Sequence, residues 1–465
     1  MSHECPRAAR AHVTVRLAAV AALAAAACTP DEAPLLGKEA MLDPETCASC
    51  HEAHYTEWSG SMHAYAAEDP VFLAMNRRGQ RETDGALGAF CVNCHAPMAV
   101  RLGLTKDGLD LDAVPAYAKG VTCYFCHSAT EVTGTHNAPI ELAGDLVMRG
   151  AIQDPVANTA HASLSSPLLD RSERRSADLC GSCHDIVTPP PHEVHLERTF
   201  AEWKASLFSK TESGDDQTCG SCHMKARDDV AANFEGVFLR PVHDHKMVGA
   251  DVALTEFPDR DAQLEQIQRE LDTTLLPRIC VVEAGGATTI TLRLENQAAG
   301  HSWPSGAAQD RRAWVEVVAY DAADAVVFSS GVVPDTEPLA SIKDPNLWRF
   351  GDTGFDAQGN EAHMFWEIAK VESALLEAPV VADKEDPAWK DIHRTREYLY
   401  SGPLPSRVTM RVRLRPIGLD VLDSLIASGD LEPEHRAKMP TFTLGSTNLE
   451  WKLSLGVSCY PKDHE

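Results

Sequence analysis

The chain has 465 residues, of which 44% are hydrophobic and 24% are charged, a balance typical of a globular protein with two or three domains. No apolar run reaches the length of a membrane span, which argues against an integral membrane protein. The formal net charge of −26 would repel phosphate backbones and argues against a nucleic-acid binder. The unusual features are 14 cysteines and 20 histidines.

The first 27 residues have the layout of a secretory signal peptide. Arginines precede an alanine-rich run from Leu17 to Ala27, which is too short to span a bilayer. The run ends at Cys28 in a pattern similar to a bacterial lipoprotein signal, with Cys28 as the lipid anchor; the alternative is ordinary cleavage nearby and a free thiol. We therefore predict a leader over 1–27, a tether over 28–37, and an exported protein in the periplasm or anchored to the outer membrane.

The strongest signal is the motif Cys-x-x-Cys-His, which occurs five times, far more often than the composition predicts by chance. Two cysteines three apart on a helical turn reach both vinyl groups of one haem, and the next histidine becomes the proximal iron ligand. Zinc would need pairs combined into four-ligand sets, a thioredoxin-like pair would occur once, and iron–sulfur ligation would not place a histidine after every pair. The motifs predict five c-type haems, attached through Cys47, Cys50, Cys91, Cys94, Cys123, Cys126, Cys180, Cys183, Cys219 and Cys222, with His51, His95, His127, His184 and His223 as proximal ligands.

The motifs lie within residues 38–250, and few long apolar segments separate them. So short a stretch cannot bury a large side-chain core for each motif, so the haems themselves must fill most of the interior. We expect a mostly helical domain of low regularity, with haems close enough to pass electrons to one another.

Each iron also needs a distal ligand, and the remaining histidines outside the leader could supply it. Methionines near the motifs, Met98 and Met224, are the alternative and would raise the potential. We favour two histidines per iron, with one five-coordinate iron left open. The distal candidates are His63, beside an aromatic stripe of helical spacing, then His161, His195, His245 and His301, with His54, His192 and His243 as rivals.

The second half of the chain changes to a β-rich pattern. Residues 251–275 are predicted to contain a connector helix, with Leu264, Ile267 and Leu271 on one face. Residues 276–465 are expected to form an antiparallel β-sandwich, with an insertion over 333–405 covering one edge. The expected strands are Ile279–Val282, Thr288–Leu294, Trp314–Ala319, Val326–Ser329, Val408–Leu414 and Leu449–Leu455.

The expected fold class is therefore α+β multidomain, with a helical multihaem domain followed by a β-sandwich. Cys280 and Cys459 lie at ends of expected strands, and an oxidising compartment would favour a disulfide between them over two buried thiols.

The five motifs, the Trp58–His63 segment and the Gly-His-x-x-Pro-Ser-Gly element at 300–306 resemble bacterial multihaem c-type cytochromes. The most similar group is the extracytoplasmic tetrahaem cytochromes with a C-terminal immunoglobulin-like domain. This resemblance implies distal roles for His63 and His301. Five motifs depart from the tetrahaem pattern, and the Cys-x-x-Cys-Lys motif of one nitrite reductase group does not occur.

Electron transfer is the favoured function, because no additional catalytic pattern accompanies the motifs. The negative charge favours redox partner proteins with basic, lysine-rich docking surfaces. The alternative is a reductase of a small nitrogen or sulfur oxyanion at one open iron, with His136 or His54 as proton donor. A structural role as a haem filament ranks third.

Overall fold

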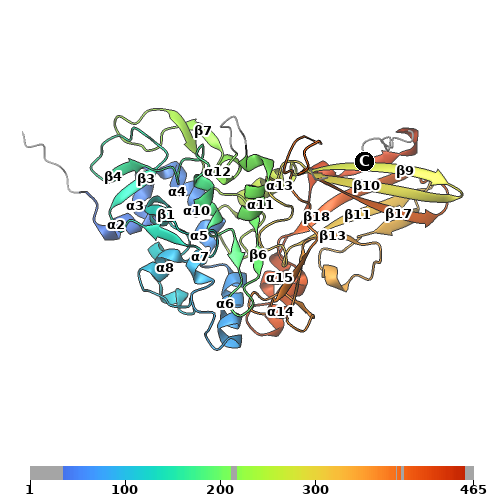
Figure 1. Cartoon of the computed structure of the whole chain (residues 1–465), viewed down its shortest axis with the longest axis horizontal. Coiled ribbons are helices and arrows are strands. Elements are labelled where there is room, and N and C mark those ends of the chain that lie inside the picture. Colours follow the sequence, from blue (N-terminus) through green and yellow to red (C-terminus); the bar gives the residue numbers. More distant parts are fainter. Residues whose placement is uncertain (1–34, 211–216, 384, 389–391, 456–465) are drawn as a thin grey trace, which may run out of the picture.

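The computed structural model describes residues 35–210, 217–383, 385–388 and 392–455. The predicted leader, Cys28 and Cys459 lie outside these ranges. Within them, a helical N-terminal half with short strand pairs is followed by antiparallel sheets, so the protein has the expected α+β multidomain fold (Figure 1). No helix in the described ranges is both long and apolar enough to cross a membrane.

The N-terminal half consists of short helices joined by long loops, because the haem motifs interrupt it and few apolar runs are long enough to form extended elements. Its helices are α2 (Lys38–Leu42), α3 (Pro44–Ala48), α4 (Glu52–Ser59), α5 (Met62–Tyr65), α6 (Pro70–Glu82), α7 (Val92–His95), α8 (Pro97–Arg101), α9 (Cys123–His127), α10 (Ser176–Gly181), α11 (Thr199–Ala205) and α12 (Cys219–His223). Four two-stranded sheets accompany them: β1 (Ala129–Val132) with β2 (Ile140–Leu142), β3 (Val147–Gly150) with β4 (Ala162–Ser165), β5 (Ile186–Val187) with β6 (His195–Glu197), and β7 (Ala226–Asp229) with β8 (Arg240–His243).

The connector helix is α13 (Arg260–Leu271), with Ile267 and Leu271 buried as the apolar spacing predicts. It is shorter than expected, because Leu275 already begins strand β9 (Leu275–Ala284). The β9–β10 hairpin turns at Gly285 and Gly286, whose φ angles of 64° and 81° are both positive, as a two-residue hairpin turn requires.

Two antiparallel sheets form the C-terminal half. The strands of the first run in the order β17-β10-β9, and those of the second in the order β12-β11-β18-β19, with β13 and β20 also attached. Inward side chains of both sheets, such as Ile290 and Val412, belong to one buried cluster, so the sheets pack as a sandwich. The strands and helices that follow β9 are β10 (Ala287–Asn296), β11 (Arg312–Tyr320), β12 (Val326–Ser330), β13 (Trp348–Phe350), β14 (Asp352–Phe355), β15 (Glu361–Ala362), β16 (Lys370–Ser373), β17 (His393–Ser401), β18 (Arg407–Arg415), α14 (Leu419–Ala427), α15 (Glu434–Lys438), β19 (Phe442–Thr443) and β20 (Leu449–Lys452).

The predicted insertion over 333–405 is wrong at its C-terminal end. Strand β17 (His393–Ser401) pairs with β10 along its whole length, from Ala287 opposite Ser401 to Glu295 opposite His393. The segment carries three charged residues and a histidine in its first five, which hid its strand character; its buried anchor is Tyr398, at 1% exposure. The short sheet β15-β14-β16 does lie within the predicted insertion.

The two halves share one hydrophobic core. Val71 and Ala74 of α6 belong to the same buried cluster as the sandwich interior and α14. At the edge of this contact the guanidinium of Arg81 binds both carboxylate oxygens of the buried Asp430, with both distances 2.6 Å. The sandwich is therefore joined firmly to the helical half, and residues from both can contribute to one site.

Cys280 is disulfide-bonded, whereas the ten motif cysteines are free. Its predicted partner, Cys459, lies outside the described residues, so the pairing itself stays a prediction.

Candidate haem-binding site

Each Cys-x-x-Cys-His motif forms one helical turn. The backbone N–H of His51 donates to the carbonyl of Cys47 at 2.8 Å, and the same bond joins His95 to Cys91 at 3.3 Å and His184 to Cys180 at 3.0 Å. The other two motifs form the short helices α9 and α12. Both thiols and the imidazole of a motif thus project from a single turn, as attachment to one haem requires.

The ring orientation of the motif histidines is set by backbone carbonyls. The Nδ1–H groups of four of them donate to carbonyl oxygens far along the chain or across a loop. Because a carbonyl can only accept, the proton must be on Nδ1, so Nε2 keeps its lone pair for a metal. The bonds are His51 to Ala231 (2.7 Å), His95 to Ala66 (3.1 Å), His127 to Arg149 (2.5 Å) and His223 to Val248 (2.6 Å).

Three of the distal candidates have the same arrangement. The Nδ1–H of His161 donates to the carbonyl of Ala162 (3.2 Å), that of His245 to His243 (3.1 Å), and that of His301 to Ser302 (2.8 Å). In His63, Nδ1 contacts the sulfur of Met247 at 2.9 Å. All four histidines therefore leave Nε2 free.

Burial favours the neutral form of four of these imidazoles, those of His63, His127, His245 and His301. Loss of solvent lowers the pKa of His63 to about 3 and that of His301 to about 4, and burial also lowers the pKa values of His127 and His245. A histidine must be neutral to bind a metal, so the environment favours the ligand form at any pH near neutrality.

Three motif histidines face a second histidine. The ring centroids are 6.2 Å apart for His51 and His161, 6.2 Å for His127 and His245, and 6.0 Å for His184 and His63. A metal–nitrogen bond of about 2 Å on each side of an iron places two axial imidazole centroids roughly 6 Å apart. The separations therefore fit one iron between each pair of rings.

His301 reaches the helical half from the sandwich. Its turn is held by Asn296, whose side chain donates to the carbonyl of His301 at 2.8 Å, and by Ser305, whose hydroxyl donates to Glu202 at 2.7 Å. There it lies close enough to His223 and His184 for both to lower its pKa. The structure thus brings the predicted docking histidine to the last two motifs.

His195 and His95 differ from this pattern. The Nε2 of His195 contacts the buried carboxylate of Asp185 at 2.5 Å, so the nitrogen that a distal ligand needs is engaged elsewhere. The ring of His95 lies flat on Phe72, with centroids 4.1 Å apart and planes within 3°. His195 is therefore held by Asp185 rather than free to act as a distal ligand.

The rival histidines have distinct places. His54 lies between two of the pairs, with its ring 6.3 Å from His51 and 4.7 Å from His245. His192 lines a surface cavity of about 530 Å³ together with Asp356 and Glu367. His136 is exposed on a loop, and Met98 is buried in the side-chain core of the helical half.

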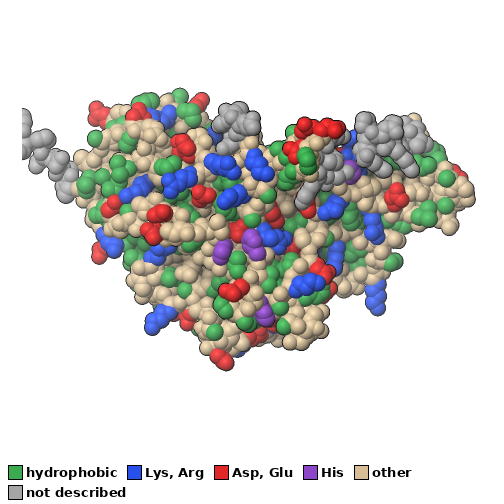
Figure 2. All heavy atoms as spheres, viewed as in Figure 1, with side chains coloured by type: hydrophobic (Ala, Val, Ile, Leu, Met, Phe, Trp, Pro, Cys, Tyr) green, Lys and Arg blue, Asp and Glu red, His purple; other side chains and the backbone are tan. Residues whose placement is uncertain are grey.

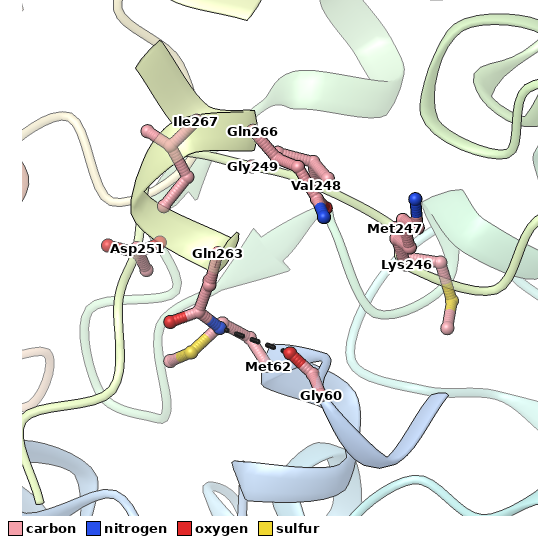
Figure 3. Close-up of a pocket in the computed structure, with 10 residues that line it drawn as sticks. All are labelled: Gly60, Met62, Lys246, Met247, Val248, Gly249, Asp251, Gln263, Gln266 and Ile267. Carbon is pink, nitrogen blue, oxygen red and sulfur yellow. Dashed lines mark hydrogen bonds between the residues drawn. The ribbon is translucent and has the colours of Figure 1, made fainter. Parts of the chain in front are cut away.

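The sequence indicates His245 as a distal candidate, but it did not reveal that the segment 245–248 contacts three other histidines. His245 faces His127, the sulfur of Met247 contacts His63, and the carbonyl of Val248 accepts from His223. Figure 3 shows this segment beside Met62 and α13, around a cavity of about 20 Å³. No pattern in the chain links these residues to His63 and His127, which lie more than a hundred positions earlier; only the closeness of His245 and Met247 in one short loop could have drawn attention to it.

The cysteines show which motifs are neighbours. The thiols of Cys47 and Cys123 interact, as do those of Cys94 with Cys183 and of Cys180 with Cys219. Cys126 lies close enough to Cys180 and Cys183 for both to affect its pKa. The fourth motif therefore contacts the second and fifth and lies near the third, and the third contacts the first.

The donors fit haem better than bare metal ions. In the described part of the chain no three His, Cys, Asp or Glu side chains converge on a common metal position, so the cysteine pairs do not combine into zinc sets. The residues that would hold haem are instead paired thiols on single turns, next to neutral histidines whose Nε2 atoms are free.

The paired thiols and neutral histidines are the donor set that c-type haem attachment needs, and two comparisons with known proteins point the same way. The profile of the family "Cytochrome c554 and c-prime" matches residues 46–128, which include the first three motifs. The fold is similar to that of a penta-heme cytochrome c552 from Thermochromatium tepidum, with 21% identity and a TM-score of 0.58 over 87% of this chain and 97% of that one. A search of curated proteins gave no match.

Proposed function

We propose that the chain is an electron-transfer protein with five covalently attached c-type haems. The observation that carries this proposal is the set of three histidine pairs whose ring centroids lie about 6 Å apart, the separation expected for two imidazoles on one iron. A c-type haem, when bound, supplies an iron that takes up and releases one electron. We assign His161, His245 and His63 opposite His51, His127 and His184, and we pair His301 with His223 because of their proximity.

The contacts between motifs support electron passage through the whole molecule. Adjacent thiols connect the first motif to the third, the third to the fourth, and the fourth to the second and fifth. Each haem would thus have a neighbour, and no side chain needs to take part in bond-breaking chemistry.

The chain's own residues prepare these sites in two ways. Backbone carbonyls fix the imidazole orientation, and burial favours the neutral form of four imidazoles, so ligands do not have to reorganise when the oxidation state changes. Two imidazole ligands per iron favour low potentials relative to a histidine–methionine pair.

The proposed location rests on the leader and Cys28, which lie outside the described residues. The proposed partners rest on the net charge of the whole chain. The leader supports export to the periplasm, where c-type haem attachment takes place, and Cys28 would tether the protein to the outer membrane. The net charge of −26 favours redox partners with basic surfaces.

The direct test is a haem count on the protein purified from a host that attaches c-type haem. Mass spectrometry of the intact chain should give five covalent haem adducts, and redox titration should show all five accepting electrons. Fewer adducts, with one or more motifs bearing free thiols, would contradict the proposal.

A second candidate function is reduction of a small nitrogen or sulfur oxyanion at the second motif. The observation that favours it is at His95, whose ring packs on Phe72, while one of the five distal candidates, His195, is engaged by Asp185. If the second motif has only one axial histidine, its iron keeps an open position for a small molecule.

This candidate predicts one high-spin iron in the resting protein. The electron paramagnetic resonance signal should shift when nitrite is added, and it should disappear in a Cys91→Ser/Cys94→Ser variant while the other four haems remain. The matched control is Cys219→Ser/Cys222→Ser, which should keep the signal. An entirely low-spin resting spectrum would remove this function.

A further inference from the structure

An exposed apolar patch lies on the loop between β7 and β8. Phe238 and Leu239 are 55% and 65% exposed, and Val230 and Phe234 are also exposed. Figure 1 shows this part of the chain at the upper left of the molecule, far from the sandwich strands β9 and β17 at the right. Several large apolar side chains exposed on one short loop of a globular protein indicate an interaction site. We call the residues Val230, Phe234, Phe238 and Leu239 the loop patch.

The loop patch is built onto the first haem motif. The backbone N–H of Asn233 donates to the carbonyl of Cys50 at 2.7 Å, and the carbonyl of Ala231 accepts from Nδ1 of His51 at 2.7 Å. The loop that displays the apolar side chains therefore also orients this axial histidine. A protein bound at the loop patch would lie next to the His51 site.

The loop is held in place by polar contacts at its C-terminal end. The guanidinium of Arg240 lies 4.0 Å from the ring centre of Phe238 and pairs with Asp154 at 2.6 Å. Gly236 packs toward Val156. A fixed aromatic side chain loses little conformational freedom when a partner covers it, which favours binding.

The rim of the loop patch is acidic. Glu235 and Asp228 are exposed, and the carboxylate of Asp154 is 70% exposed even with Arg240 beside it. The two arginines at the ends of the loop are already paired, Arg227 with Glu57 and Arg240 with Asp154. Figure 2 shows hydrophobic and acidic side chains along this upper left edge, with Lys and Arg side chains among them and on the face below. An apolar centre with a carboxylate rim is complementary to a surface with an apolar centre and a lysine rim.

We propose that the loop patch is the docking surface for a soluble electron-transfer protein whose contact face is apolar and ringed by lysines. The inference rests on the proposed electron-transfer function and adds the place where electrons enter or leave. In each encounter one electron crosses: the partner's redox centre is oxidised and the chain is reduced at the His51 site, or the reverse. No covalent bond forms or breaks.

The test is the rate of electron exchange with a lysine-rich monohaem cytochrome c as probe, measured by stopped-flow absorbance. A Phe238→Ser/Leu239→Ser variant should lower the second-order rate constant about tenfold, the effect of losing one or two anchor residues from an interface. A Glu235→Lys variant should also slow the reaction and weaken its dependence on salt. The matched control, Val282→Ser/Leu399→Ser, removes exposed apolar side chains from the sandwich and should leave the rate unchanged.

Two further measurements separate the failure of this inference from failure of the proposed function. Reduction by dithionite, which needs no docking surface, should be the same in all variants, and each should retain five haems. Equal probe rates in the loop variant and the sandwich control would overturn the docking site while leaving electron transfer intact. Sedimentation with phosphatidylcholine vesicles tests a lipid surface as the alternative partner. If the loop variant keeps the wild-type rate with the probe but no longer sediments with the vesicles, the loop patch binds lipid and the inference is overturned.

Discussion

Replacing His245 with alanine is expected to convert one low-spin haem of this protein to a high-spin form and to raise its reduction potential by on the order of 100 mV. The reason is the position of the imidazole, whose centroid is 6.2 Å from that of His127 with the ring planes within 13°. Its Nδ1–H donates to the carbonyl of His243, which leaves Nε2 unprotonated and free to bind a metal. Electron paramagnetic resonance and a redox titration of the holoprotein measure the two effects.

The neighbouring histidines provide the controls. His243 lies two residues away, at the end of β8, and makes no histidine ring contact like those described, so His243→Ala should leave the spectrum unchanged. His54 is 4.7 Å from His245 and could replace it as a ligand, so the double variant His54→Ala/His245→Ala keeps the test decisive. A double variant with an unaltered spectrum, or a new high-spin signal in His243→Ala, would refute the assignment.

Removal of the fourth motif by Cys180→Ser/Cys183→Ser is expected to divide the electron path. The thiols of this motif are the link from the third motif to the second and fifth. If electrons leave through the His51 site to the basic cytochrome c probe, only the haems of the first and third motifs should respond rapidly. The fast absorbance change should fall to about half of that expected from the four remaining haems.

The matched control removes a terminal motif instead. In Cys219→Ser/Cys222→Ser the four remaining haems stay connected, so all of them should react in the fast phase. Both variants must first show four covalent haems and wild-type circular dichroism, because a missing haem also removes apolar filling from the interior. Complete rapid oxidation of the fourth-motif variant would show that electrons bypass this motif.

The sequence by itself determined the chemistry of the proximal side. Thiols and imidazole in Cys-x-x-Cys-His are local, so one helical turn brings them together whatever the rest of the fold does. The α+β class was also predictable, since apolar spacing at Ile267 and Leu271 and alternation in Val408–Leu414 are local patterns. The role of 393–401 as the strand that pairs with β10 was missed, because a strand with many charges resembles a loop until its pairing is known.

Only the tertiary structure decided which histidine faces which. It separated His245 from His243, turned His195 toward Asp185, and placed His161 opposite His51, more than a hundred residues earlier in the chain. It also showed that the motifs do not follow one another in space as they do in sequence, with the fourth contacting the second and fifth and lying near the third. The physical reason is that a distal ligand is defined by direction and distance across an iron, and those depend on how distant loops pack rather than on spacing along the chain.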